Sequence, residues 1–265
     1  MINKQQSFDK IYYSHNPKPV ICLNKRLAVF FCAKSGCTFI VKWFFNQIDQ
    51  LTAALDFHPF VHRYRWMVYS KSKHFIESEK RFIKHEGKDF LKIKVIRNPF
   101  ERAVSSYIHF LEMLSNNHKE INNNFGIGYQ KMDYSFAEFL NLLEKIDINS
   151  CNIHWRQQFH FIEKRIKFDH IIYLKDSIKE LLKLEKIHNF KKSKNIDRLA
   201  QSNHHSSKRT DTDKDTFCGF STFSVAIKKN RPLYKSFYNF ELEEKVRKIY
   251  KIDFEEYSFN YSYTT

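Results

Sequence analysis

Residues 33–38, Ala-Lys-Ser-Gly-Cys-Thr, combine a cation, small side chains and hydroxyl groups in a pattern suited to binding a phosphate-like anion. They follow the β-favouring run 26–32 and precede residues 39–51, whose apolar side chains recur every three or four positions as on a helix. A helix N-terminus preceded by small residues presents free backbone N–H groups to an anion, and Lys34 adds a mobile positive charge there. The lysine comes first in this loop, whereas a Walker A loop carries it at the end, so ATP or GTP hydrolysis is disfavoured.

Arg97 occupies an equivalent place, at the end of the strand predicted for residues 90–96. Asn98 is the predicted N-cap of the next helix, with Pro99 as its first residue, Glu101 as its third and an apolar period over residues 103–114. Capping explains Asn98 and Glu101 fully, so neither is given a chemical role. In an open parallel sheet, ligands bind beyond the carboxyl ends of the strands, so we expect Lys34 and Arg97 to be neighbours in space.

Strands that alternate with helices predict an α/β protein with a central, mainly parallel sheet flanked by helices. Residues 18–23 and 26–32 are predicted to form a tight hairpin or two adjacent strands. The other predicted elements are a helix from the Ser135–Glu138 capping box through residue 143, a buried strand at 170–174, a helix at 176–184 and a final helix near 241–250, followed by an aromatic tail through residue 263. The charged segment 191–215 is predicted to be a long loop or a mobile segment. Without a repeat or a convincing boundary, residues 1–265 are expected to form a single domain.

The charge balance favours a polyanionic partner. Lys and Arg number 45 against 29 Asp and Glu, a formal net charge of 45 − 29 = +16, which suits nucleic acid, an anionic lipid surface or a phosphorylated small molecule. The five cysteines are widely spaced without a C-x-x-C pair, which indicates reduced, mostly buried thiols. No apolar run reaches the roughly 20 residues of a membrane helix, and the polar N-terminus has no apolar signal core, so we expect a cytoplasmic protein.

Four segments together resemble the sulfotransferases that use 3′-phosphoadenosine 5′-phosphosulfate (PAPS), most closely the carbohydrate sulfotransferases. Residues 34–38 look like that superfamily's 5′-phosphosulfate loop, and residues 95–107, with Arg97 and Ser105 eight apart, are similar to its 3′-phosphate motif. Residues 152–158, Asn-Ile-His-Trp-Arg-Gln-Gln, and the strand 168–173 are similar to the His-Trp segment of the carbohydrate branch, and residues 206–210, 249–254 and 259–261 resemble its C-terminal signatures. These segments span nearly the whole chain in the family's order.

One departure from the carbohydrate branch concerns a cysteine pair that usually follows the His-Trp segment. This chain has Phe161-Ile162-Glu163-Lys164 there. Relatives with the pair are anchored in an oxidising lumen, so its absence fits a soluble cytoplasmic enzyme of microbial type and leaves the acceptor open.

The resemblance implies a P-loop-NTPase-like sulfotransferase fold and an in-line, metal-independent transfer of a sulfuryl group from PAPS to a carbohydrate or glycoconjugate hydroxyl. Lys34 is then the catalytic cation, because negative charge grows on the leaving oxygen in a loose transition state. The general base is expected between the two phosphate motifs, with His62 as first choice and His58 as the nearest alternative, and His154 of the His-Trp segment is a further candidate. The cofactor-binding residues that the resemblance implies are Lys34, Ser35, Gly36, Cys37, Thr38, Phe39, Arg97, Ser105, Tyr173, Lys208 and Arg209.

Other functions stay open at the level of sequence. A nucleotide kinase or NTPase of related fold would need magnesium and a triphosphate. A basic, aromatic-rich chain also suits a nucleic-acid-binding module, although no such motif is present, and a degenerate sulfotransferase would bind a glycan without reacting. For His62, an ordinary half-buried histidine is as good an interpretation as a base. The partner expected is a glycan or glycolipid rather than nucleic acid, and the basic surface also permits peripheral association with a membrane.

Overall fold

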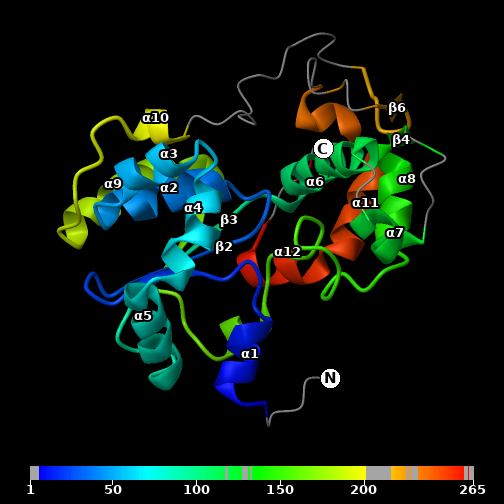
Figure 1. Ribbon diagram of the computed structural model, residues 1–265. Coiled ribbons are helices and arrows are strands. Elements are labelled where there is room, and N and C mark those ends of the chain that lie inside the picture. Colours follow the sequence, from blue (N-terminus) through cyan, green and yellow to red (C-terminus); the bar gives the residue numbers. More distant parts are fainter. Residues whose placement is uncertain are drawn as a thin grey trace. The chain divides into compact units, whose positions relative to one another are not determined.

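A four-stranded sheet organises the part of the molecule that carries the predicted phosphate loop (Figure 1). The structure is a computed structural model and describes residues 6–116, 119–126, 131, 133–200, 216–224, 227, 232–259 and 262. Strands run in the order β1-β2-β3-β5, with β1 antiparallel to β2 and the other pairs parallel. The bounds are β1 Val20–Cys22, β2 Leu27–Phe31, β3 Leu91–Ile96 and β5 His170–Tyr173. The mainly parallel α/β sheet and the hairpin are thus confirmed.

The chain divides into two compact units, here called unit 1 (residues 1–97 and 160–203) and unit 2 (residues 98–159 and 204–265). Unit 1 holds the four-stranded sheet with α1 Phe8–Ser14, α2 Cys37–Gln47, α3 Leu51–Phe57, α4 Val61–Met67, α5 Lys73–Lys84, α9 Ser177–Ile187, α10 Ile196–Ala200 and the short 3-10 helices η1 Tyr69–Lys71, η2 Phe161–Lys164 and η3 Leu174–Asp176. Unit 2 holds α6 Pro99–Ser115, α7 Lys119–Phe125, α8 Phe136–Leu143, α11 Phe240–Ile249, α12 Lys251–Tyr257, the 3-10 helix η6 Tyr234–Phe237 and the strand pair β4 Tyr134–Ser135 and β6 Thr222–Phe223. The single domain stays a prediction.

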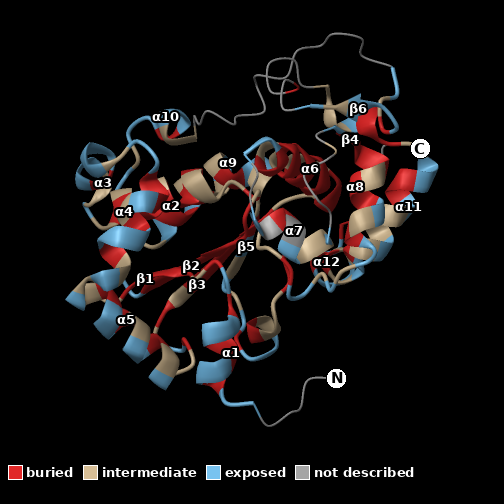
Figure 2. Cartoon of the chain, turned by 45° about the vertical axis from the view of Figure 1, so that its right-hand side comes forward, coloured by how far each residue is buried: buried red, intermediate tan, exposed pale blue. Residues whose placement is uncertain are grey.

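Both faces of the sheet in unit 1 are covered, because alternate residues of β2 point to opposite sides. Leu27, Val29 and Phe31 join a core with α2, α3, α4, α9 and α10, whereas Ala28 and Phe30 join a second core with α1 and the end of α5. All five residues of β2 are buried (Figure 2). A strand buried on both faces is apolar throughout, which is why this run was readable from the sequence.

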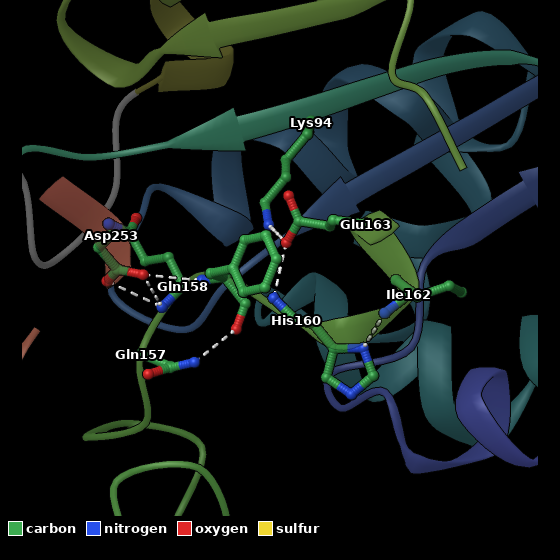
Figure 3. A network of polar contacts seen from close by, with 8 residues as sticks. Lys94, Gln157, Gln158, His160, Ile162, Glu163 and Asp253 are labelled. Atoms are coloured by element: carbon green, nitrogen blue, oxygen red, sulfur yellow. Dashed lines mark hydrogen bonds and ion pairs between the residues drawn. The ribbon is translucent and has the colours of Figure 1, made fainter. Parts of the chain in front are cut away.

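Two lysines interrupt the apolar pattern of β3, and both find partners inside unit 1. The Lys92 ammonium lies 3.0 Å from Asp169 Oδ2 and donates to the Phe90 carbonyl oxygen at 2.8 Å. Lys94 forms an ion pair with Glu163, which also accepts a hydrogen bond from the backbone N–H of His160 (Figure 3). Burying an ammonium is tolerated only when it is paired, so Glu163 allows β3 to lie deep in the sheet. The segment that replaces the relatives' cysteine pair therefore has a structural role here.

Unit 2 is built around α6. Asn98 Oδ1 accepts from the Phe100 N–H at 2.9 Å, and Ser135 and Glu138 form the expected capping box of α8. Each cap satisfies a backbone donor that the helix itself leaves open. Asp253 of α12 accepts from the backbone N–H groups of Gln158 and Phe159 at 2.9 and 2.8 Å, which fixes the end of the 152–159 segment (Figure 3).

Four local features differ from the sequence predictions. The helix predicted over 39–51 ends at Gln47, because Asp49 adopts a left-handed backbone (φ 58°) before α3 begins. Residues 251–257 form α12 rather than a tail, and α10 lies within the predicted loop 191–215, of which residues 201–215 are outside the described residues. Strand β5 is at a sheet edge and Ile171 is exposed, so this strand is only partly buried.

Candidate active site

The loop after β2 has the backbone shape of an anion-binding turn. Lys34 and Gly36 both lie in the left-handed region, with φ of 66° and 79°, and the Ser35 N–H donates to the Cys32 carbonyl oxygen at 3.3 Å. The first bond of α2 runs from the Ile40 N–H to the Gly36 carbonyl oxygen. The N–H groups of residues 37–39 therefore precede the helical ladder and are directed toward the loop, as at any helix N-terminus.

Gly36 is required by space as well as by its backbone angle. A Cβ at this position would lie 2.3 Å from Leu174 Cδ1, which belongs to η3 directly after β5. The loop after β2 therefore packs closely on the segment that follows β5. Tyr173, the last residue of β5, is half-buried at this same edge.

Arg97 directly follows β3 and contacts the loop. Its Nη1 donates to the Lys34 carbonyl oxygen at 3.0 Å. The structure thus brings Lys34 and Arg97 together at the carboxyl ends of adjacent parallel strands, as the sequence indicates. Two basic residues thus come together at the loop that precedes the N-terminus of α2.

The remaining predicted cofactor residues divide into three groups. Ser35 is fully buried, Cys37 and Thr38 are half-buried in the first turn of α2, and the side chain of Phe39 belongs to the core, so that Phe39 can offer only its backbone N–H. Ser105 is half-buried on α6, in unit 2. Lys208 and Arg209 lie outside the described residues.

His62 is buried on α4 in an aromatic setting. Its ring stacks on Trp66 at a centroid distance of 5.7 Å and lies 6.3 Å from the ring of Phe31, the last residue of β2. Within the described part of the chain, neither ring nitrogen has a hydrogen-bond partner. Burial, with a further contribution from the Arg65 charge, lowers the pKa of His62 from 6.5 to about 3. The ring is therefore neutral at pH 7, and no described residue bonds to its unprotonated nitrogen.

The two alternative bases have other contacts. His58 Nδ1 accepts from the Phe60 N–H at 2.8 Å, in the turn that leads into α4. In unit 2, His154 Nδ1 lies 2.8 Å from Asn152 Oδ1, and its ring lies 4.0 Å from that of His109, whose Nδ1 is 3.1 Å from Glu112 Oε2. His58 therefore has a local role in this turn.

The neutral state of His62 has a consequence for stability that is open to measurement. The imidazole of His62 protonates near pH 6.5 in the unfolded chain but only near pH 3 in the folded one. The contribution of neutral His62 to the free energy of unfolding is therefore complete above pH 6.5 and is lost as the pH falls toward 3. The free energy of unfolding should fall by up to roughly 1 kcal/mol per pH unit more steeply in wild type than in His62→Phe. Denaturant titrations at pH 7.5, 6 and 5 measure both slopes. Equal slopes would show that folding leaves the pKa of His62 near its unfolded-state value.

Arg65 is a residue of this region that the sequence predictions leave out. It lies one turn after His62 on α4, is only 8% exposed, and its guanidinium stands 5.2 Å from the Phe31 ring centroid. Its Nη1 has no hydrogen-bond partner among the described residues. The i, i+3 spacing of His62 and Arg65 is a usable sequence signal, since it places both on one helix face.

Two negative findings apply to the described ranges. Within them, no group of three or more His, Cys, Asp or Glu side chains is arranged to hold a metal ion. No helix in the described residues has the length and apolar character needed to cross a membrane. All five cysteines lie in the described ranges as thiols, and three of them are buried.

The parallel sheet, the left-handed loop before α2 and the cations at its carboxyl edge define an α/β protein of the class that binds phosphorylated ligands at strand ends. Comparison with protein-family models matches residues 17–261 to the sulfotransferase family, of the carbohydrate sulfotransferase type. The chain belongs to this family, whose members transfer a sulfuryl group and generally use PAPS. Comparisons with curated proteins and with solved structures give no match.

Proposed function

We propose that this chain transfers a sulfuryl group from PAPS to a hydroxyl of a carbohydrate or glycoconjugate acceptor. The observation that supports the proposal most is the hydrogen bond from Arg97 Nη1 to the Lys34 carbonyl oxygen, 3.0 Å long, which joins the two phosphate motifs at the loop before α2. Family membership over residues 17–261 supports it. The fit to the donor rests on the left-handed loop, the open N–H groups of residues 37–39 and the unpartnered buried Nη1 of Arg65.

The loop and its cations have distinct parts in this proposal. The backbone N–H groups of residues 36–39 and the Thr38 hydroxyl bind the 5′-phosphate, and the Lys34 ammonium neutralises the charge that grows on the leaving oxygen. Arg97 and Ser105 bind the 3′-phosphate, Tyr173 lies near the adenine, and Lys208 and Arg209 close over the nucleotide. When bound, PAPS supplies an already activated sulfuryl group, so the proposal assigns no metal.

His62 is the proposed general base. Its neutral ring and unused nitrogens suit proton acceptance from the acceptor hydroxyl, but a pKa near 3 makes it a weak base in the ligand-free protein. A bound polyanion would favour the imidazolium and raise that pKa, because an opposite charge within a few ångströms stabilises the protonated form. The base therefore becomes effective when the donor site is filled.

The acceptor class and the compartment complete the proposal. A net charge of +16 favours an acidic glycan or a glycolipid with a phosphorylated carrier. The cysteine thiols suit the reducing cytoplasm, to which we assign the protein. The same charge excess would also attract nucleic acid, so a salt series with an arbitrary oligonucleotide is a necessary control.

Calorimetric titration of adenosine 3′,5′-bisphosphate, the product nucleotide, tests the donor assignment. Without metal, the wild type is expected to bind it with a dissociation constant of about 1 μM or tighter, equivalent to roughly −8 kcal/mol, and to bind adenosine 5′-monophosphate much more weakly. A preference for a magnesium triphosphate would indicate a kinase or NTPase instead. Equal affinity for adenosine 3′,5′-bisphosphate and adenosine 5′-monophosphate would refute the 3′-phosphate site. Once the donor is established, sulfation assays with a panel of glycans test the acceptor class.

A further inference from the structure

Arg65 is a buried cation with no polar partner at its Nη1. The residue is 8% exposed, and no ion pair or hydrogen bond of its guanidinium occurs within the described residues. The guanidinium instead lies over two aromatic rings, 5.2 Å from the centroid of Phe31 and 5.3 Å from that of Trp66. A buried charge without a counter-ion is costly, and such a group in a native fold calls for an explanation by a ligand or a function.

The surroundings of Arg65 identify where that ligand would lie. Phe31 is the last residue of β2, and Cys37 is the first of α2, so the residues of the phosphate loop stand between them. Burial lowers the pKa of Arg65 to about 10, and the charge of Cys37, at the start of α2, opposes this shift. Arg65 remains charged at neutral pH. A fixed cation and a helix N-terminus with open N–H groups favour the same ligand, an anion.

His62 provides an independent second observation on the same helix face. Both its ring nitrogens and Arg65 Nη1 are buried and without partners in the described part of the chain. Two unsatisfied polar side chains one helical turn apart, both against Phe31, indicate a common polar ligand rather than two separate defects. An oxyanion bonded to Arg65 would also place negative charge next to His62, the proposed base.

We propose that Arg65 binds oxygens of the tetrahedral oxyanion held by residues 34–38, on the side of the loop that faces His62. This inference rests on the proposed function, in which that oxyanion is the 5′-phosphosulfate of the donor. The phosphate and the sulfuryl group offer the same chemistry to a guanidinium, namely an oxyanion edge that accepts two N–H bonds. Arg65 then adds to Lys34 a second cation, which is held rigidly by packing.

The test compares Arg65→Met with Arg63→Met, a control that removes the same charge from an exposed position of the same helix. Arg65→Met should weaken the binding of adenosine 3′,5′-bisphosphate about 10- to 100-fold, which is the range for loss of one charge-assisted hydrogen-bonding group. The affinity of Arg63→Met should stay near that of wild type. The Tm of ligand-free Arg65→Met should equal or exceed that of wild type, because replacing an unpaired buried cation by an apolar side chain removes a desolvation cost. Arg65→Lys, which keeps the charge, should bind with intermediate affinity.

Two ligands separate the two oxyanion sources. A similar loss for adenosine 3′,5′-bisphosphate and for PAPS without acceptor assigns Arg65 to the 5′-phosphate, and a larger loss for PAPS assigns it to the sulfuryl group. Unchanged affinity for both ligands overturns the proposal. A Tm lower by several degrees in both Arg65 variants also overturns it, because that outcome makes Arg65 a structural residue.

Sodium sulfate distinguishes a failure of this inference from a failure of the proposed function. Sulfate stabilises any folded protein by exclusion, and Arg63→Met reports that general effect. A larger sulfate-dependent rise in Tm for wild type and Arg63→Met than for Arg65→Met supports the anion site even if neither nucleotide binds. The opposite outcome is that wild type binds the nucleotide and that Arg65→Met matches wild type in both nucleotide affinity and sulfate response. That outcome keeps the proposed function and refutes the role of Arg65.

Discussion

Lys34→Met is expected to lower kcat for sulfuryl transfer by about 100- to 1000-fold while changing the affinity for adenosine 3′,5′-bisphosphate only a few-fold. Removing one preorganised charge from a site where negative charge develops has that magnitude of effect on turnover. Affinity for the product persists because the backbone N–H groups at the start of α2 and Arg97 are untouched. The measurement combines calorimetry with initial rates of PAPS consumption in the presence of an acceptor glycan.

The loop should survive this substitution. Arg97 donates to the carbonyl oxygen of Lys34 and not to its side chain, and methionine tolerates φ of 66° about as poorly as lysine does. Lys25→Met is the matched control, since Lys25 is exposed in the turn between β1 and β2. A kcat within threefold of wild type in Lys34→Met would remove the catalytic role, whereas loss of kcat in Lys25→Met would indicate long-range electrostatics.

The sequence predicts well where helices and strands begin when the signal is carried by neighbouring residues. Asn98 and Ser135 each cap a helix through a side-chain oxygen, and that chemistry involves only residues two or three positions away. The apolar run of β2 and the Asn24-Lys25 turn likewise specify a hairpin locally. The neighbourhood of Lys34 and Arg97 follows from a topological rule, because parallel strands share one carboxyl edge.

Features that depend on distant packing are not readable in this way. The end of α2 requires a left-handed Asp49, although the apolar period continues to Leu51. α12 forms where Asp253 accepts two backbone N–H groups of residues 158 and 159, about 95 positions away in sequence. Arg65 is one of 45 Lys and Arg residues, and although its i, i+3 spacing from His62 places both on one helix face, the spacing does not reveal that Arg65 is buried against Phe31.

Arg97→Ala is expected to weaken the binding of adenosine 3′,5′-bisphosphate by roughly 30-fold or more and to leave that of adenosine 5′-monophosphate nearly unchanged. Truncating one partner of a buried charged hydrogen bond costs about 2–5 kcal/mol, and each 1.4 kcal/mol corresponds to about tenfold in affinity. Calorimetry with both nucleotides gives the two affinities for each variant. Arg26→Ala, in the exposed turn before β2, removes the same charge and serves as control.

Two nucleotides are needed because Arg97 can act in two ways, by supporting the Lys34 loop or by binding the 3′-phosphate. Its Nη1 supports the loop through the Lys34 carbonyl oxygen, so its loss could disturb the 5′-phosphate site as well. A disturbed loop would weaken both nucleotides equally, since both carry a 5′-phosphate, whereas a lost 3′-phosphate ligand weakens only the bisphosphate. Arg97→Lys keeps the charge but not the planar fork, and it should recover part of the affinity. Equal weakening of both nucleotides in Arg97→Ala would make Arg97 a support of the Lys34 loop and would transfer 3′-phosphate recognition to other residues.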